Sequence, residues 1–355
     1  MKRIFVFLLV LAEFITLFGC GEKETLEPIS SSPSVSRMVS DSSPLETNQS
    51  AAVCMGSVSH PVHRIVQLGF MEKADELGYE GHILGLDDAL PQELYDCWLA
   101  GAKEYDIAGA VCWVGDDSAY EFLKELHGMG VKVVVPYFPQ KYYEAKEFID
   151  VNPHSDLEQT MLDAGDYLVE HLRDRGIDTG ALGVSVSGPA LSHDNVREYM
   201  DYMESHYPEY RNADMVLEIS TREKAIEKIA GYIDNNPDLV GAIGRTGNST
   251  IVWSEAKART GRDDIFTMGM DYTKQNLDLL NSGDIDALIC QPIYEAGYVG
   301  MELIDALING EVYNKTEEQW HYKLENRIIS KNGQGQNGTA YYYDIYERSE
   351  ARFGS

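Results

Sequence analysis

Short apolar segments alternate with amphipathic helical patterns from Ala51 onward, and this alternation constrains the fold more than any other feature of the chain. Strands are expected at residues 51–58, 82–86, 107–113, 131–135, 181–186, 215–219, 240–243, 265–268 and 287–290. Helices are expected between them, notably at residues 62–77, 91–103, 156–173, 194–206, 221–235 and 292–307. Regular alternation of this kind predicts parallel sheets with helices on both faces.

A break in the alternation at residues 150–153 divides this region into two parts. Two sheets of about five or six strands each fit the number of segments better than one very large sheet does. In open α/β sheets, ligands bind beyond the carboxyl ends of the strands. Two sheets that face each other would enclose a cleft lined by their strand-end loops, and we expect the functional residues there.

The N-terminus has the pattern of an export signal. A basic start, Met1-Lys2-Arg3, precedes an apolar run and the sequence Leu17-Phe18-Gly19-Cys20. This ending resembles the lipobox of bacterial lipoproteins, which implies that residues 1–20 are a signal peptide and that Cys20 carries lipid. Phe18 is bulkier than the usual residue, so cleavage elsewhere and an uncleaved anchor are the alternatives. A membrane-spanning helix needs about 20 apolar residues, and Glu13 interrupts such a run.

Residues 21–50 are rich in Ser, Pro and Glu and lack apolar periodicity, which predicts a flexible tether. The whole chain has a formal charge of −29, from 29 basic and 58 acidic residues. Nucleic-acid binding requires clustered Lys and Arg to neutralise phosphates, and no such cluster occurs. The acidity also disfavours anionic lipid surfaces, so any membrane association should come from the anchor.

Neither a metal site nor a cofactor site is indicated. Beyond Cys20 the chain has four cysteines and no C-x-x-C pair: Cys54, Cys97, Cys112 and Cys290. We interpret them as buried thiols, with a Cys54–Cys112 bridge between strands as the alternative. His60 and His63 could offer two nitrogens to a metal from one helical turn, but no third ligand accompanies them.

Catalytic signatures are incomplete. Gly183-Val-Ser185-Val-Ser187 lacks the final glycine of a nucleophile elbow, and the glycines of residues 241–247 have the wrong spacing for a dinucleotide-binding loop. Paired acids such as Asp87-Asp88 occur in loops, where solvated charge is the usual role. We therefore expect a protein that is not an enzyme.

A long stretch carries the most specific signal. It contains Met268-Gly269-Met270-Asp271 at one strand end, Gln291-Pro292 at the next, and the glycine-rich Tyr294-Glu-Ala-Gly297-Tyr-Val-Gly300 after it. In order, spacing and residue type, these segments resemble the periplasmic sugar-binding proteins of ABC transporters, of the ribose/galactose-binding type. The same fold forms the effector domain of LacI-like repressors. The resemblance covers residues 51 to about 323.

This resemblance implies an α/β fold of two doubly wound parallel-sheet lobes joined by hinge strands. The N-terminal lobe would comprise residues 51–150 plus 292–320, and the C-terminal lobe residues 151–291 plus 321–348. Hinges would lie near residues 150–152, 291–292 and 320–322. Closure of the lobes about such hinges would bury a ligand and change the shape that a partner meets.

The resemblance also implies ligand-binding residues in the second lobe. Asp271 would accept hydrogen bonds from sugar hydroxyls, and Gln291 would both donate and accept. Arg197 would donate to hydroxyl or ring oxygens, and Asn248 lies near a position where the family often has Asn. The alternatives are that Asp271 caps the following helix and that Arg197 pairs with a surface acid.

In the first lobe, His60 and His63 occupy the positions of the family's polar and aromatic residues after the first strand. Trp113 and Tyr137 follow later strands and could stack on the apolar face of a sugar ring. Helix capping, packing or a place in the core are the alternatives for these side chains. Pro136-Tyr137-Phe138 replaces the Asp-Arg pair usual in the family, so a common pentose or hexose ligand is in doubt.

The expected function is that of a monomeric, exported bacterial lipoprotein that captures a small polar ligand, a carbohydrate, for the membrane permease of an ABC importer. The alternative is a sensor that presents its ligand-closed form to a membrane kinase or chemoreceptor. An enzyme that uses the acidic cleft is a third hypothesis. A repressor is set aside, because no DNA-binding helix-turn-helix precedes Ala51 and an export signal does.

Overall fold

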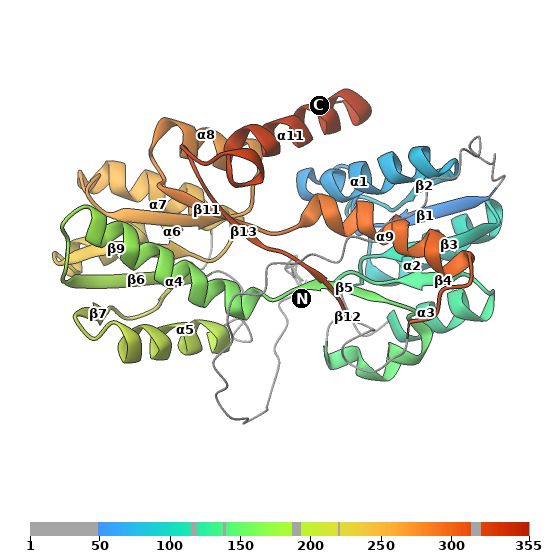
Figure 1. Cartoon of the computed structure of the whole chain (residues 1–355), viewed down its shortest axis with the longest axis horizontal. Helices are drawn as coiled ribbons and strands as arrows, with labels where there is room; N and C mark the ends of the chain where they lie inside the picture. Colours follow the sequence, from blue (N-terminus) through green and yellow to red (C-terminus); the bar gives the residue numbers. More distant parts are fainter. Residues whose placement is uncertain are drawn as a thin grey trace, which may run out of the picture.

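The computed structural model describes residues 49–114, 119–137, 140–186, 193–218, 221–313 and 321–354. The expected signal peptide, the lipidated Cys20 and most of the tether lie outside the described residues. Figure 1 shows two lobes side by side along the longest axis of the molecule. None of the described helices is long and apolar enough to cross a membrane.

The first sheet has four parallel strands in the order β2-β1-β3-β4: β2 (Glu80–Leu84), β1 (Ser50–Cys54), β3 (Ile107–Cys112) and β4 (Lys132–Val134). Its helices are α1 (Pro61–Leu77), α2 (Pro91–Glu104), α3 (Ala119–Gly128) and the distant α9 (Ile293–Ile308). α9 packs closely on α1, because a Cβ atom on Gly297 would lie 1.9 Å from the Val66 carbonyl oxygen. Gly69 makes the reciprocal approach on α1, where a Cβ atom would lie 2.2 Å from the Tyr294 carbonyl oxygen.

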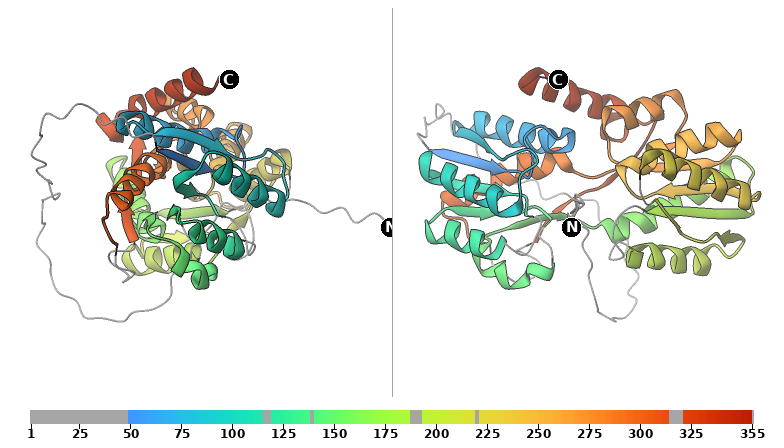
Figure 2. Two further views of the ribbon diagram at one scale, coloured as in Figure 1. Left: turned by 90° about the vertical axis from the view of Figure 1, so that its right-hand side faces the viewer. Right: turned by 180° about the vertical axis from the view of Figure 1, so that it is seen from behind.

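The second sheet has seven strands, in the order β13-β11-β10-β9-β6-β7 with β8 also paired to β6. They are β6 (Gly180–Val186), β7 (Tyr210–Asn212), β8 (Val216–Leu217), β9 (Leu239–Gly244), β10 (Phe266–Met270), β11 (Ala287–Cys290) and β13 (Arg327–Ser330). Its helices are α4 (Leu157–Asp174), α5 (His193–His206), α6 (Arg222–Asn235), α7 (Gly247–Thr260) and α8 (Lys274–Ser282). The views in Figure 2 show helices on both faces of each sheet.

Two further strands, β5 (Asn152–Ser155) and β12 (His321–Leu324), form a parallel pair separate from both sheets. The chain also passes from β11 in the second sheet directly to α9, which packs on the first. The sequence-based prediction of two doubly wound sheets with connecting strands is therefore confirmed.

Three local predictions need correction. Of the strand expected at residues 215–219, the described part, 215–218, holds the two-residue strand β8, and the edge strand β13 runs antiparallel to β11. Residues 339–345, expected to be a final strand or a docking segment, belong to the helix α11 (Thr339–Phe353). The described cysteines are free, with Cys54 and Cys112 facing each other in register on β1 and β3.

Candidate functional site

The order of the strands identifies one edge of each sheet as the place for a ligand. In the first sheet, β1 lies between β2 and β3. The chain therefore adds β2 on one side of β1 and β3 on the other. In the second sheet, β6 has the same position between β7 and β9. Such reversals open a crevice beyond the carboxyl ends of the strands. The residues that follow β1, β3, β4, β9, β10 and β11 are therefore the candidates.

The two histidines follow β1. His60 is the N-cap of α1, and its ring nitrogen accepts a hydrogen bond of 3.3 Å from the Val62 N–H. His63 is 7% exposed, and its Nδ1 lies 3.1 Å from the Ser57 nitrogen and 3.0 Å from the Ser57 carbonyl oxygen. Burial lowers the pKa of His63 to about 4, and the neighbouring His60 contributes to this. His63 is therefore a neutral ring at neutral pH.

The loop that carries these histidines is anchored by a residue that the sequence analysis left among solvated acids. The Asp87 carboxylate accepts hydrogen bonds from the Ser57 hydroxyl and from the backbone nitrogens of Val58, at 3.0 Å, and Ser59, at 3.1 Å. These donors hold the pKa of Asp87 below its ordinary value. Asp87 thus fixes the turn between β1 and α1 and, through it, the position of His63.

A continuous row of rings extends from these histidines. The ring centroids of His60 and His63 are 4.9 Å apart, those of His63 and Trp113 6.3 Å, and those of Trp113 and Tyr137 5.3 Å. The structure therefore brings together the four side chains that the sequence predicted for the first lobe. We call His60, His63, Trp113 and Tyr137 the aromatic row.

Tyr137 ends this row next to the strands that connect the lobes. Its side chain is 9% exposed and packs against Ala296 of α9 and Leu324 of β12. Burial raises the pKa of Tyr137, and the charges of Glu295 and Asp271 raise it further. Tyr137 therefore lies beside the connecting strand β12 and the first turn of α9.

In the second lobe, Asp271 and Gln291 end neighbouring strands and contact each other. The Gln291 side-chain nitrogen donates a hydrogen bond of 2.8 Å to one carboxylate oxygen of Asp271. The Asp271 side chain is 7% exposed; burial raises its pKa, and hydrogen bonds from Gln291 and the Gly247 backbone oppose that rise. The helix-cap alternative for Asp271 is wrong, because Thr273 is the N-cap of α8.

Two other segments hold Asp271 in place. Its backbone has a φ of 67°, an uncommon conformation for a residue with a side chain. The buried Asn276 side chain donates to the carbonyl oxygens of Met270, at 3.0 Å, and Asp271, at 3.2 Å. Gly247 approaches from α7, where a Cβ atom would lie 2.9 Å from the second Asp271 carboxylate oxygen. The carboxylate is thus positioned before any ligand arrives.

Comparison with protein-family models gives one match, to the periplasmic binding protein domain, over residues 51–312. The chain belongs to this family. The family consists of binding proteins, which agrees with the expectation that this chain is not an enzyme. The glycines at α1 and α9 and the Asp271–Gln291 contact lie within the matched region.

Solved structures of low identity share the fold of this periplasmic binding protein. The arabinose-binding protein AraP from Geobacillus stearothermophilus is 15% identical, with a TM-score of 0.68, over 80% of this chain and 97% of that one. A sugar-binding protein of a sugar ABC transporter from Bacillus halodurans is 18% identical, with a TM-score of 0.68, over 84% and 100%. A solute-binding protein from Agrobacterium vitis, bound to α-D-tagatopyranose, is 18% identical, with a TM-score of 0.66, over 83% and 99%.

The structure also places the other two residues predicted for the second lobe. Arg197 is exposed on α5, and Asn248 is exposed in the first turn of α7. At the end of β9 the buried side chain is instead Arg245, which is 2% exposed. Sequence reasoning missed Arg245 because it considered residues 241–247 only as a nucleotide-binding motif. Its signal was its position, directly after the strand.

A second missed residue is Glu218, at the end of β8. It is 5% exposed and accepts a hydrogen bond from the Ser185 hydroxyl, which in turn accepts one of 2.7 Å from the Trp253 indole nitrogen. Burial raises the pKa of Glu218, and the bond from Ser185 opposes that rise. Glu218 therefore adds a buried acid at the carboxyl end of the second sheet.

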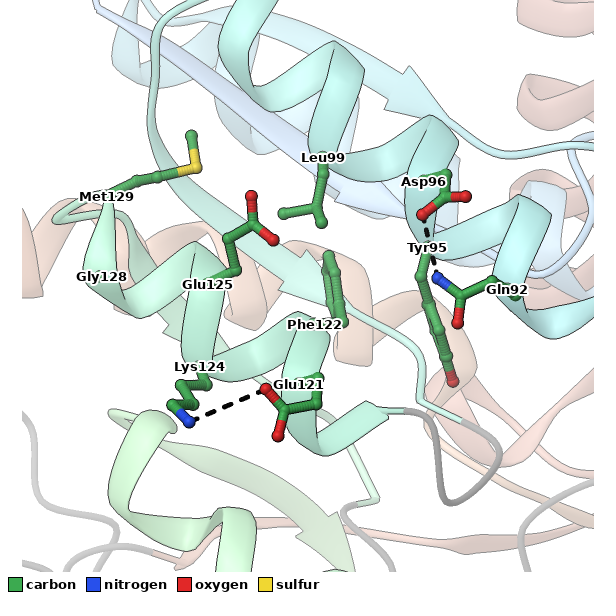
Figure 3. A pocket seen from close by; sticks show the side chains of 10 residues that line it. All are labelled: Gln92, Tyr95, Asp96, Leu99, Glu121, Phe122, Lys124, Glu125, Gly128 and Met129. Carbon is green, nitrogen blue, oxygen red and sulfur yellow. Dashed lines mark hydrogen bonds and ion pairs between the residues drawn. The ribbon is translucent and has the colours of Figure 1, made fainter.

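A separate cavity of about 520 Å³ lies between α2 and α3 (Figure 3). Leu99 and Phe122 form its apolar part, and the ion pair between Lys124 and Glu121, at 3.7 Å, lies on its rim. None of the predicted ligand-binding residues lines it. The described residues also contain no group of three His, Cys, Asp or Glu side chains that could hold a metal ion.

Proposed function

We propose that this protein captures a neutral sugar between the strand ends of its two lobes and delivers it to the permease of an ABC importer. The observation that carries the proposal is the pairing of two kinds of surface. The aromatic row in the first lobe offers the faces of uncharged rings, whereas Asp271 and Gln291 in the second lobe are a fixed acceptor and donor.

A sugar ring matches this pairing. One face of a pyranose or furanose exposes C–H groups, which pack on Trp113 or on the neutral His63 ring. Its hydroxyls then point towards Asp271, which accepts, and Gln291, which donates and accepts. A site with fixed polar groups rejects analogues that lack a hydroxyl, because its own buried groups would be left without partners.

The similar proteins of known structure support the sugar class. They include an arabinose-binding protein, a protein bound to tagatopyranose and the sugar-binding protein of a sugar ABC transporter. The family description supports a place outside the cytoplasm. In this proposal, Cys20 anchors the chain to the membrane and residues 21–50 let the binding domain reach the permease.

A thermal-shift screen of the full chain against pentoses, hexoses, ketoses, sugar alcohols and amino sugars tests the proposal. A ligand at 100 times its dissociation constant should stabilise the fold by about 2.7 kcal/mol. The shift should vanish in Trp113→Ala and shrink in Asp271→Asn. The matched controls Tyr105→Ala and Asp163→Asn change an exposed aromatic and an exposed acid elsewhere and should keep it.

Absence of any shift with the folded chain would contradict sugar capture. A shift that survives both Trp113→Ala and Asp271→Asn would contradict the site. Uptake of the sugar by cells should also require the permease of the ABC importer. Uptake that continues after deletion of the permease would contradict the importer role.

A further inference from the structure

The C-terminal helix α11 contacts both lobes, and nothing in the proposed capture of a ligand accounts for it. It follows β13 and the short 3-10 turn Gly335–Asn337, so the chain delivers it from the second sheet. Figure 1 and the right-hand view of Figure 2 show it reaching from α8 of the second lobe over to α1 of the first. Residues of α11 are in contact with residues of both α1 and α8.

The first half of α11 is seated mainly on the second lobe, although the Tyr341 hydroxyl also donates a hydrogen bond of 3.1 Å to Glu295 of α9. The Tyr343 hydroxyl donates a hydrogen bond of 2.7 Å to the Asp278 carboxylate of α8 and accepts one of 3.2 Å from the Asn281 side chain. The Tyr342 ring, 3% exposed, lies 4.5 Å from the ring of Tyr272 at the end of β10. This seat is partly buried and contains aromatic contacts, which salt does not weaken.

The second half of α11 is attached to the first lobe by charges. Arg348 pairs with Glu72 of α1, and Arg352 pairs with Asp75 of α1 at 2.7 Å. The side chains of the two arginines are 36% and 30% exposed. Ion pairs at this exposure are weak individually and are screened by salt.

Further contacts extend this attachment. The Arg64 guanidinium of α1 donates a hydrogen bond of 2.5 Å to the Gly354 carbonyl oxygen just after the end of α11. Tyr294 of α9 donates a hydrogen bond of 2.6 Å to Glu72, and the Arg348 guanidinium lies 5.2 Å from the Tyr294 ring centroid. The second half of α11 therefore contacts both helices that pack together on the first sheet.

We propose that α11 is an interlobe clasp, which holds the two lobes in the described arrangement and must release α1 when they rotate to close on a ligand. Rotation about β5, β12 and the β11–α9 connection moves α1 relative to α8. One rigid helix cannot remain seated on both. The exposed ion pairs to α1 are the weaker attachment and break first. This inference rests on the proposed function only in that rotation is taken to accompany ligand capture.

The test measures the distance between the lobes by double electron–electron resonance on the full-length chain. Nitroxides are attached through p-acetylphenylalanine at the exposed positions 121, on α3, and 224, on α6, so that the native cysteines are not used. The probe variant is Arg348→Ala/Arg352→Ala. The matched control Arg259→Ala removes an ion pair of 2.8 Å between α7 and α6 within the second lobe.

The probe variant should increase the population of a second interlobe distance about tenfold, as the loss of two exposed ion pairs predicts. Wild-type protein in 1 M salt should change in the same way, because charges are then screened within about 3 Å. Glu72→Gln/Asp75→Asn should reproduce the effect from the α1 side, and Arg348→Lys/Arg352→Lys should restore the wild-type distribution. Arg259→Ala should leave it unchanged.

A distance distribution in the probe variant that superimposes on that of wild type would overturn the clasp. The clasp would also be overturned if the arginine variant changed the distances and Glu72→Gln/Asp75→Asn did not. The contact with α1 would then not be the cause. These measurements need no ligand, so they decide on the clasp even if the sugar screen fails. If a sugar binds but the Arg348→Ala/Arg352→Ala variant has the interlobe distances of the wild type, the clasp fails and sugar capture stands.

Once a sugar is known, the clasp predicts a second effect. An arrangement that competes with the closed form lowers apparent affinity by the fraction of molecules that can close. The Arg348→Ala/Arg352→Ala variant should therefore bind about tenfold more tightly than wild type and lose the salt dependence of binding. Unchanged affinity in this variant would contradict the clasp as a control on closure.

Discussion

Protonation of His63 should make the folded protein less stable at low pH. His63 is buried against the Ser57 backbone, and burial lowers its pKa from the ordinary value of 6.5 to about 4. Between these two values the unfolded chain binds a proton that the folded chain does not. Stability is therefore complete above pH 6.5 and is lost progressively as the pH falls towards 4.

The magnitude follows from the two pKa values. Each pKa unit between the folded and unfolded states is worth 1.36 kcal/mol, so the difference for His63 corresponds to about 3 kcal/mol at pH 4. His63→Gln keeps a polar side chain within reach of Ser57 but removes the titration. Urea unfolding of both proteins at steps from pH 7.5 to pH 4 should thus show the wild type losing about 3 kcal/mol more than the variant.

Comparison with the variant isolates this effect from the carboxyl groups. Burial raises the pKa values of Asp271, Glu218 and Glu295 in the folded protein, which changes stability over an overlapping pH range in the opposite direction. These groups are the same in both proteins, so their contribution cancels in the difference. Parallel pH profiles of the wild type and His63→Gln would refute the reasoning. The control His206→Gln, at an exposed histidine of α5, should leave the free energy of unfolding at pH 7.5 unchanged.

Three further outcomes are expected. Gly297→Ala should destabilise the fold by about 1–3 kcal/mol in urea unfolding, because the new methyl group meets the backbone of α1, whereas Gly231→Ala on α6, with nothing within 4 Å, should stabilise it by up to about 1 kcal/mol. Asp271→Asn should weaken sugar binding about tenfold to a hundredfold by calorimetry, since a hydrogen bond to a charged acceptor is worth about 1.5–3 kcal/mol. Reductant should leave the Tm unchanged, because Cys54 and Cys112 are free thiols; a lowered Tm would indicate a bridge.

Local sequence pattern predicted the repeating core of the fold well. The helix at residues 91–103 and the strand at residues 287–290 agree with α2 and β11 to within one residue at each end. The strand β13 and the helix α11, which lie outside the repeat, were not predicted. β13 is held by its antiparallel pairing with β11, and α11 by contacts with α1 and α8, more than 50 residues away in the sequence. The hydrophobic periodicity within a segment carries no information about contacts with distant parts of the chain.

The candidate site divides in the same way. Position after a strand, together with the family resemblance, indicated the residues of the aromatic row, Asp271 and Gln291, because parallel strands that are neighbours in the sheet end at one edge. The hydrogen bond between Asp271 and Gln291 was not predicted. Arg245, which directly follows β9, was passed over for Asn248, three residues further along, because the sequence does not show which of the two side chains is buried. Which side chain is buried depends on how α7 begins, and the Thr246 cap determines that.

The orientation of Asp271 shows why residue type alone does not define this site. A carboxylate directly after a strand could turn back to cap the next helix, and Thr273 already fills that role. Asp271 instead adopts a φ of 67°, held by the Asn276 side chain, while Gly247 leaves room for its second oxygen. These supports come from the loops after two adjacent strands, β9 and β10, which only the folded sheet brings together. The acceptor is therefore a property of the sheet edge, and substitutions at Asn276 or Gly247 should impair binding without changing any group that the ligand contacts.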